Sequence, residues 1–462
     1  MKNKKNFIVA IGPILFLSCW FIFHSLGFTT PQSITASTAI LCALWWSTEA
    51  IPIPVTSLIP LALLPFAGVL NRTQVSESYG SPLILLLLGG FIISKSLEKT
   101  GAHRRVALGL VHLVGADKPG KLVFGFMLAS AVLSMWISNT ATTLMLLPVA
   151  LAITEKMPDD RLAIPLLLGI AYAASIGGIG TPVGTPPNLV FMEIYRQTTG
   201  IELGFLDWMK WGVPVVVVML PITAWWLTRK LSAPPVELPA VGPWRRAEIR
   251  VFIVFAITAT MWITRTPDGW GWSDYFGLSW ANDGQVALLA AIALFIIPDG
   301  TVLENGEKGR LLDWHHASKI PWGVLLLFAG GIALAKAFVV TGLSTMLSDQ
   351  LTELSQLPVM LMILIIALVV TFLTEMTSNT ATTTLLMPIL AATAIAADLE
   401  PELLMVPAAI SASCAFMLPV ATAPNAIVFG SNQVPIQKMI KTGFVLNLIG
   451  AIVVTIVTSS IL

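Results

Sequence analysis

Two copies of the tripeptide Ser-Asn-Thr lie within apolar parts of the sequence, where polar groups need partners. The first copy is Ser138–Thr140 and the second is Ser378–Thr380. Unsatisfied polar groups in hydrocarbon cost several kcal/mol each, so such residues must be buried in protein or line a wet cavity. Hydroxyl and amide oxygens suit a hard cation such as sodium, and a helix N-terminus favours an anion. The motifs therefore predict that a cation and an anion bind together.

A hydroxyl residue precedes each motif by one helical turn. Ser134 lies four residues before Ser138, and Thr374 lies four residues before Ser378, so each pair shares one face of a helix. In a purely structural role, Ser and Thr would bond to helix carbonyls while Asn joined neighbouring helices. That explanation suffices for one motif alone, but duplication of the whole arrangement argues against it.

A second pair of matching blocks follows the motifs. Gly184–Asn188 reads Gly-Thr-Pro-Pro-Asn, and Ala421–Asn425 reads Ala-Thr-Ala-Pro-Asn. Proline interrupts the preceding helix and leaves backbone carbonyls free to bind a cation. We therefore expect two cation sites beside one anion site. Since no Lys or Arg lies at these motifs, helix ends and bound cations must balance the charge of the anion.

The composition is that of a helical membrane protein. Of the 462 residues 56% are apolar and only 11% are charged, and the mean hydropathy is +0.83. Apolar runs approach the roughly 20 residues that a spanning helix needs. Strands of a β-barrel would instead alternate over about ten residues. A net charge of +1 makes nucleic acid a poor partner.

The predicted fold is all-α and polytopic, with about eleven transmembrane helices and two re-entrant helical hairpins. The hairpins are expected at 122–153 and 358–396, because each of these apolar stretches is too long for one span and contains Ser-Asn-Thr. The expected spans are 7–28, 37–46, 51–70, 82–96, 162–179, 211–228, 251–264, 286–297, 322–339, 403–420 and 442–458.

Clusters of Lys and Arg indicate the topology. They occur at the N-terminus, in 95–121, in 229–250 and in 308–319, and the positive-inside rule places them in the cytoplasm. The N-terminus is then cytoplasmic and the C-terminus external. The first hairpin opens to the cytoplasm and the second to the exterior, so the two halves form inverted repeats, as in many secondary transporters.

The predicted topology divides the chain into five parts. Residues 1–80 and 251–320 are the scaffold helices of the first and second repeats, and the Pro-rich segment 231–250 is a cytoplasmic linker. Residues 81–230 and 321–462 contain the hairpins. Glu49 and Glu375 lie at apolar edges without an acidic counterpart in the other repeat, which favours structural hydrogen bonding or a contribution to sodium affinity over a duplicated proton site.

The motifs fit a carrier better than an intramembrane enzyme or a channel. An intramembrane enzyme would need a nucleophile beside a base, and no His lies near either Ser-Asn-Thr. A channel would line its path with rings of charges or carbonyls. We therefore expect a carrier rather than an enzyme or a channel, with no organic cofactor.

The paired Ser-Asn-Thr and Thr-x-Pro-Asn blocks resemble those of the divalent anion:sodium symporter family over nearly the whole chain. The resemblance implies a homodimer in the cell inner membrane, with a scaffold domain and a transport domain that moves as an elevator. It implies import of C4-dicarboxylates such as succinate, fumarate or malate, coupled to sodium. Citrate or sulfate carriers and dicarboxylate exchangers remain alternatives within the family.

The resemblance also assigns the site residues. The first sodium site would comprise Ser134, Ser138, Asn139 and Gly184, and the second Thr374, Ser378, Asn379 and Ala421. Ala423 stands where the family pattern has Pro, which affects the substrate contact there. The dianionic carboxylate would contact Asn139, Thr140, Thr185, Asn379, Thr380, Thr422 and Ala423.

Overall fold

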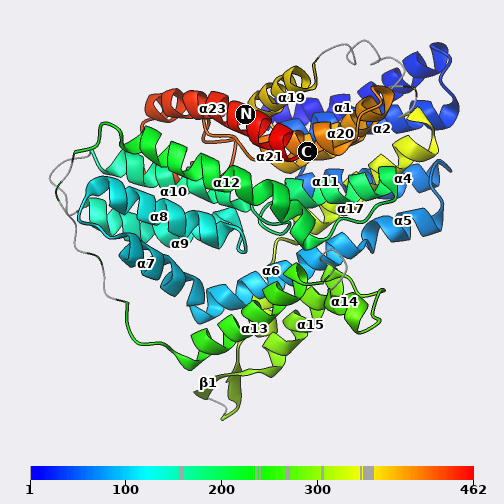
Figure 1. Ribbon diagram of the computed structural model, residues 1–462. Coiled ribbons are helices and arrows are strands. Elements are labelled where there is room, and N and C mark those ends of the chain that lie inside the picture. The colour runs from blue at the N-terminus through cyan, green and yellow to red at the C-terminus, as the bar shows by residue number, and fades with distance from the viewer. Residues whose placement is uncertain are drawn as a thin grey trace.

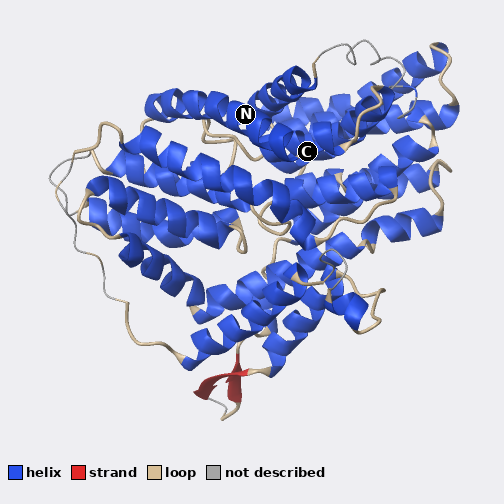
Figure 2. Ribbon diagram, viewed as in Figure 1, coloured by secondary structure: helices blue, strands red, loops and turns tan. Residues whose placement is uncertain are grey.

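The computed structural model consists almost entirely of helices (Figure 2). It describes residues 2–155, 161–232, 234, 238, 241–265, 271–302, 306–343, 346 and 358–462. Within these ranges the only sheet is an antiparallel pair, β1 (Pro298–Val302) and β2 (Lys308–Arg310). Part of the predicted linker 231–250 lies outside the described residues.

The first half of the chain contains twelve described helices, and the first Ser-Asn-Thr lies between α8 and α9. They are α1 (Lys2–Ser25), α2 (Thr30–Thr48), α3 (Ile53–Thr56), α4 (Leu58–Phe66), α5 (Arg72–Tyr79), α6 (Pro82–Thr100), α7 (Ala102–Val114), α8 (Pro119–Ser134), α9 (Asn139–Thr154), α10 (Ala163–Gly178), α11 (Pro186–Thr199) and α12 (Phe205–Thr228).

The second half repeats this helical character and adds the small sheet between α15 and α16. Its described helices are α13 (Arg246–Ile263), α14 (Trp272–Tyr275), α15 (Asp283–Ile296), α16 (Trp314–Ala317), α17 (Trp322–Val340), α19 (Val359–Thr374), α20 (Asn379–Ala396), α21 (Glu402–Ser411), α22 (Ala423–Gly430) and α23 (Ile436–Ile461).

Both long apolar stretches are broken where the sequence predicts. Helix α8 ends at Ser134 and α9 begins at Asn139, while α19 ends at Thr374 and α20 begins at Asn379. In the first break the Ser138 hydroxyl accepts a hydrogen bond from the Ala141 N–H at 3.2 Å, which caps α9. Each Ser-Asn-Thr therefore starts the second helix of a helix pair.

Two predicted spans are wrong as single helices. Segment 51–70 forms α3 and α4, which meet at Ser57, and Pro60 lies in the first turn of α4, where its missing N–H is tolerated. Segment 403–420 is helical only to Ser411. Beyond it the backbone N–H groups of 416–418 bind side chains instead of helix carbonyls, so the helix stops.

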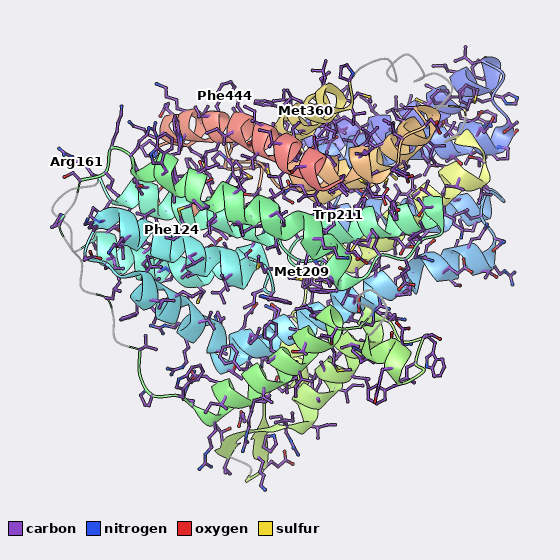
Figure 3. All side chains as sticks on the ribbon, viewed as in Figure 1. Phe124, Arg161, Met209, Trp211, Met360 and Phe444 are labelled. Atoms are coloured by element: carbon purple, nitrogen blue, oxygen red, sulfur yellow. The ribbon has the colours of Figure 1, made fainter. Side chains whose placement is uncertain are left out.

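Six helical stretches in the described chain are long and apolar enough to cross a membrane. They are Lys5–Ser25, Arg72–Thr100, Phe205–Thr228, Trp322–Val340, Asn379–Ala396 and Ile436–Ile461. Apolar side chains on outward surfaces, such as Phe444 on α23 and Met360 on α19 (Figure 3), are 45% and 55% exposed, as lipid-facing residues are. The protein is an integral membrane protein, while the predicted number of spans stays a prediction.

The helices gather around the two breaks. Helix α10 packs against α8, α9 and α22, and α20 packs against α11, α17 and α21. Helices α6, α13 and α15 pack together beside β1 (Figure 1). These neighbours bring the ends of α9, α11, α20 and α22 toward one region of the molecule.

Candidate functional site

One cavity of about 1090 Å³ brings the four paired blocks of the sequence together. Both Ser-Asn-Thr motifs line it, as do the first residues of the blocks that begin at Gly184 and Ala421. The predicted site residues in its wall are Ser138, Asn139, Thr140, Gly184, Thr185, Ser378, Asn379, Thr380, Ala421, Thr422 and Ala423. Among the predicted set, Ser134 and Thr374 are fully buried behind this wall.

In the first break, hydrogen bonds hold Asn139 at the start of α9. The Ser134 hydroxyl lies 2.5 Å from Asn139 Oδ1 and donates to it. The backbone carbonyl of Asn139 accepts from the Thr143 hydroxyl at 2.8 Å. The predicted hydroxyl and amide oxygens of the first cation site therefore lie close together.

The second break repeats these contacts. The Thr374 hydroxyl lies 2.7 Å from Asn379 Oδ1 and 3.0 Å from the carbonyl of Ala412. The carbonyl of Asn379 accepts from the Thr383 hydroxyl at 2.8 Å. The oxygen atoms predicted for the second cation site are thus arranged like those of the first.

The two Pro-Asn blocks also make matching contacts. Asn188 donates from Nδ2 to the carbonyls of Gly178 at 2.9 Å and Thr181 at 2.7 Å. Asn425 donates from Nδ2 to the carbonyls of Ala415 and Leu418, both at 3.1 Å. Each Asn holds the turn that precedes its own helix, and this turn presents Gly184 or Ala421 to the cavity.

Close backbone packing explains why the first block has Gly where the second has Ala. A Cβ atom on Gly184 would lie 2.5 Å from the carbonyl oxygen of Gly178, a backbone atom that is itself held by Asn188. Ala421 has its side chain almost fully buried without such a conflict. The two predicted cation sites are therefore similar but not identical.

Four helix N-termini meet at the cavity wall, at Asn139, Pro186, Asn379 and Ala423. The first-turn N–H groups of a helix lack intrahelical partners and carry the positive end of the helix dipole. Their convergence favours a small anion, and the side chains of Thr140 and Thr380 add hydroxyl donors.

The structure adds charged side chains that sequence reasoning had not assigned to the cavity. Lys5, Lys95 and Lys319 line it together with Glu49 and Glu98. The Lys95 ammonium lies 2.6 Å from a Glu98 carboxylate oxygen, so part of this charge is paired. The sequence could have indicated this ion pair, because residues three apart, such as Lys95 and Glu98, are neighbours on a helix surface.

A histidine on α7 also lines the cavity. His103 Nδ1 lies 2.8 Å from the carbonyl of Leu97. Burial lowers the pKa of His103, although the bond to Leu97 and the nearby Glu98 act in the opposite direction. The ring is neutral at pH 7, so the lysines supply the positive charge here.

The tips of the two breaks are packed differently. Trp136 stacks on Phe205 with ring centroids 5.9 Å apart, and Phe205 stacks on Trp262 at 4.7 Å. Phe255 meets the Trp136 ring edge-on at 4.9 Å. Met376, the residue at the corresponding place in the second break, is 77% exposed and lines the cavity.

Comparison with known proteins identifies related transporters. The family model described as citrate transporter matches residues 43–406. The sodium-dependent dicarboxylate transporter SdcS of Staphylococcus aureus strain USA300 is 40% identical over 493 aligned residues, covering 99% of this chain and 92% of the relative. SdcS of strain MSSA476 is 39% identical with the same coverage.

Two solved transporter structures share the fold at low sequence identity. The Alcanivorax borkumensis YdaH transporter has a TM-score of 0.56 and 13% identity, with 85% of this chain and 88% of that chain covered. Neisseria gonorrhoeae MtrF, described as illuminating a class of antimetabolite efflux pumps, has a TM-score of 0.50 and 17% identity, with 84% and 82% covered.

Proposed function

Because this chain belongs to the divalent anion:sodium symporter family, we propose that it imports C4-dicarboxylates such as succinate, fumarate or malate together with sodium. It is a transporter and not an enzyme. The observation that carries the substrate proposal is the one cavity lined by both Ser-Asn-Thr motifs and by the first residues of the blocks that begin at Gly184 and Ala421. The full-length relatives named as sodium-dependent dicarboxylate transporters support the same choice.

The dianion would bind between the two Ser-Asn-Thr motifs. One carboxylate would accept hydrogen bonds from Asn139, Thr140 and Thr185, and the other from Asn379, Thr380 and the backbone at Thr422 and Ala423. Hydrogen bonds to charged groups are worth about 1.5 to 3 kcal/mol each, so a few of them suffice for specific binding. The converging helix N-termini would balance part of the negative charge.

Sodium would bind beside the substrate at two sites. The oxygens of Ser134, Ser138, Asn139 and Gly184 would form the first site, and those of Thr374, Ser378, Asn379 and Ala421 the second. The paired hydroxyl and amide oxygens in both breaks support this assignment. A bound cation next to each carboxylate would supply the positive charge that the motifs lack, which couples the two ligands.

The proposed mechanism is an elevator in a homodimer. The two inverted repeats would supply a scaffold domain and a transport domain, with the N-terminus cytoplasmic and the C-terminus external in the cell inner membrane. Lys5, Lys95 and Lys319 line the cavity and come from segments that the charge distribution assigns to the cytoplasm. The described conformation would therefore be open toward the cytoplasm.

Citrate, sulfate and exchange are the competing functions, and the citrate transporter match is the observation that favours citrate. Uptake by purified protein in liposomes separates them. We expect labelled succinate to accumulate with an inward sodium gradient and not with a potassium gradient. Preferential uptake of citrate or sulfate would change the substrate, and equal uptake with either cation but only against internal dicarboxylate would establish exchange.

A further inference from the structure

A buried carboxylate on α11 binds the start of α6. The Ser81 hydroxyl donates to Glu193 Oε2 at 2.7 Å, and the two residues are 1% and 0% exposed. Within α11, Glu193 Oε1 accepts from Arg196 Nη2 at 2.7 Å and from Gln197 Nε2 at 3.1 Å. Its own helix therefore holds the carboxylate in place, so the bond to Ser81 fixes the position of α11 relative to α6.

The two helices belong to different groups of neighbours. Helix α6 packs closely on α15, since a Cβ atom on Gly89 would lie 2.5 Å from Ala287 Cβ. Helix α11 packs mainly against α20, and the Tyr195 hydroxyl binds the Glu402 carboxylate at the start of α21. In the proposed elevator α15 belongs to the scaffold, whereas α20 carries part of the substrate site. The bond between α6 and α11 would therefore join the scaffold to the moving domain.

The bond lies far from the cytoplasmic part of the cavity wall. Lys95 lines the cavity and lies fourteen residues after Ser81, which is about 21 Å along α6. Helix α11 begins at the cavity wall with Pro186, and Glu193 lies about two turns further along it. Because the charge distribution assigns Lys95 to the cytoplasm, the bond lies toward the exterior. It would close the external side of the protein in the conformation open toward the cytoplasm.

The second repeat has an indole where the first has the Ser81 hydroxyl. Ser81 lies eight residues before Gly89, the first residue of a Gly-Gly pair in α6. Trp322 lies eight residues before Gly330, the first residue of the matching pair in α17. The indole N–H of Trp322 donates to the carbonyl of Ser318, on its own segment. Trp322 therefore occupies the place of Ser81 with its donor already in use.

The carboxylate is also missing from the second repeat. Glu193 lies nine residues after Gly184, and Gly430 lies nine residues after Ala421. Gly430 has no side chain to accept a hydrogen bond. In inverted repeats, the conformation open to the other side of the membrane can be reached when the two repeats exchange their conformations. The outward-open conformation of this protein would then place Trp322 near Gly430 without an equivalent bond.

Two valines report which side is open. Val183 precedes Gly184 and Val420 precedes Ala421, and both valines line the cavity. Val183 is 9% exposed and is covered by α6, where a Cβ atom on Gly90 would lie 3.3 Å from Val183 Cγ1. Val420 is 83% exposed. If the repeats exchange their conformations, Val183 becomes exposed and Val420 becomes covered.

We propose that the Ser81–Glu193 bond is a latch on the external side that stabilises the conformation open toward the cytoplasm. Movement of α11 with the substrate site would break this bond, and the second repeat offers no equivalent bond to replace it. The equilibrium between the two conformations is therefore biased toward the one that is open to the cytoplasm. This inference rests on the proposed function, since it assumes the elevator mechanism.

The test measures how fast two introduced thiols react in full-length protein whose three native cysteines are replaced. A membrane-impermeant maleimide is applied to V183C from outside and to V420C from the cytoplasmic side, in potassium buffer without succinate. We expect S81G to accelerate V183C labelling at least about fivefold, because a hydrogen bond to a charged group is lost in only one of the two conformations. V420C labelling should not accelerate.

Two further variants control for other effects of S81G. Glycine is nearly as good a helix N-cap as serine, and N71G removes the cap of α5, where Asn71 accepts from the Gln74 N–H at 2.9 Å. N71G should leave both labelling rates at the wild-type level. Adding E193Q to S81G should change the V183C labelling rate less than about twofold, because the bond is already absent.

The outcomes distinguish the latch from the proposed function. Unchanged V183C labelling in S81G, or an equal acceleration in N71G, would overturn the latch and leave sodium-coupled uptake intact. If S81G is not recovered as a monodisperse protein, S81A removes the same hydroxyl and must give the same acceleration. Labelling without either ligand does not depend on what is carried, so sodium-independent succinate uptake would overturn symport alone. Absence of external V183C labelling in protein that transports succinate would overturn the elevator and the latch together.

Discussion

The Thr374 hydroxyl lies 2.7 Å from Asn379 Oδ1, so a residue at the end of one helix orients the first residue of the next. The amide oxygen that accepts this bond belongs to a proposed ligand of the second cation, and Ser134 orients Asn139 in the same way. A fully buried hydroxyl therefore orients a side chain that lines the cavity.

Replacing that hydroxyl should weaken sodium binding. In Thr374→Ala the Asn379 amide loses a hydrogen bond worth about 0.5 to 1.5 kcal/mol, which corresponds to roughly a two- to tenfold rise in the half-saturating sodium concentration. Thr374→Ser keeps the hydroxyl and should match the wild type. Sodium titration of succinate uptake measures both. Identical titrations for the Ala and Ser variants would contradict this role.

Gly184 provides a test of backbone packing at the first site. In Gly184→Ala the new Cβ would lie 2.5 Å from the Gly178 carbonyl oxygen, so the turn must move. Overpacking of this kind costs about 1 to 3 kcal/mol. We expect a lower melting temperature and weaker sodium binding. The reverse change in the other half, Ala421→Gly, removes a methyl group and should be milder. A harmless Gly184→Ala would mean that the turn is not rigid.

The aromatic contacts of Trp136 predict an asymmetric effect on stability. Trp136→Ala removes stacking on Phe205 and the edge contact with Phe255, each worth about 0.5 to 1.5 kcal/mol beyond area burial. The melting temperature should fall clearly. Met376→Ala, at the exposed corresponding position, should change it little. Equal changes in melting temperature for the two variants would show that the aromatic contacts of Trp136 do not stabilise the first break.

The positions of the helix breaks could be predicted from the sequence because their cause is local. In the first break Ser138 caps α9 and the Ser134 hydroxyl binds Asn139, which satisfies polar groups that lipid would leave unpaired. The duplication of Ser-Asn-Thr also led us to expect that both motifs contribute to one site, and both motifs do line one cavity.

Contacts between distant segments were not predictable in this way. Hydropathy predicted a continuous span over 403–420. It contains no information on the tertiary contacts by which Glu375 and Asn447 bind the backbone N–H groups of 416–418. Lys319 lies far in sequence from both motifs, and only the packing of the helices places it on the cavity wall. Stacking of Trp136 on Phe205 likewise depends on tertiary structure.

Two substitutions in the second motif should separate cation binding from substrate binding. Asn379 is proposed to contact both ligands, so Asn379→Asp places a carboxylate beside the dianion. Two unit charges about 4 Å apart interact by about 1 kcal/mol in water and about 4 kcal/mol at an effective dielectric near 20. The apparent affinity for succinate should fall at least about tenfold, equivalent to roughly 1.4 kcal/mol. Sodium binding measured without substrate should persist or tighten.

Thr380→Ala is the matched change, because Thr380 is proposed to contact only the substrate. It removes one neutral donor to a carboxylate, a loss of about 1.5 to 3 kcal/mol. The affinity for succinate should fall while sodium binding measured without substrate, for example by sodium-dependent thermal stabilisation, stays at the wild-type level. Normal succinate transport by Asn379→Asp would contradict the proposed contact of Asn379 with the substrate. Loss of substrate-free sodium binding in Thr380→Ala would contradict the proposal that Thr380 contacts only the substrate.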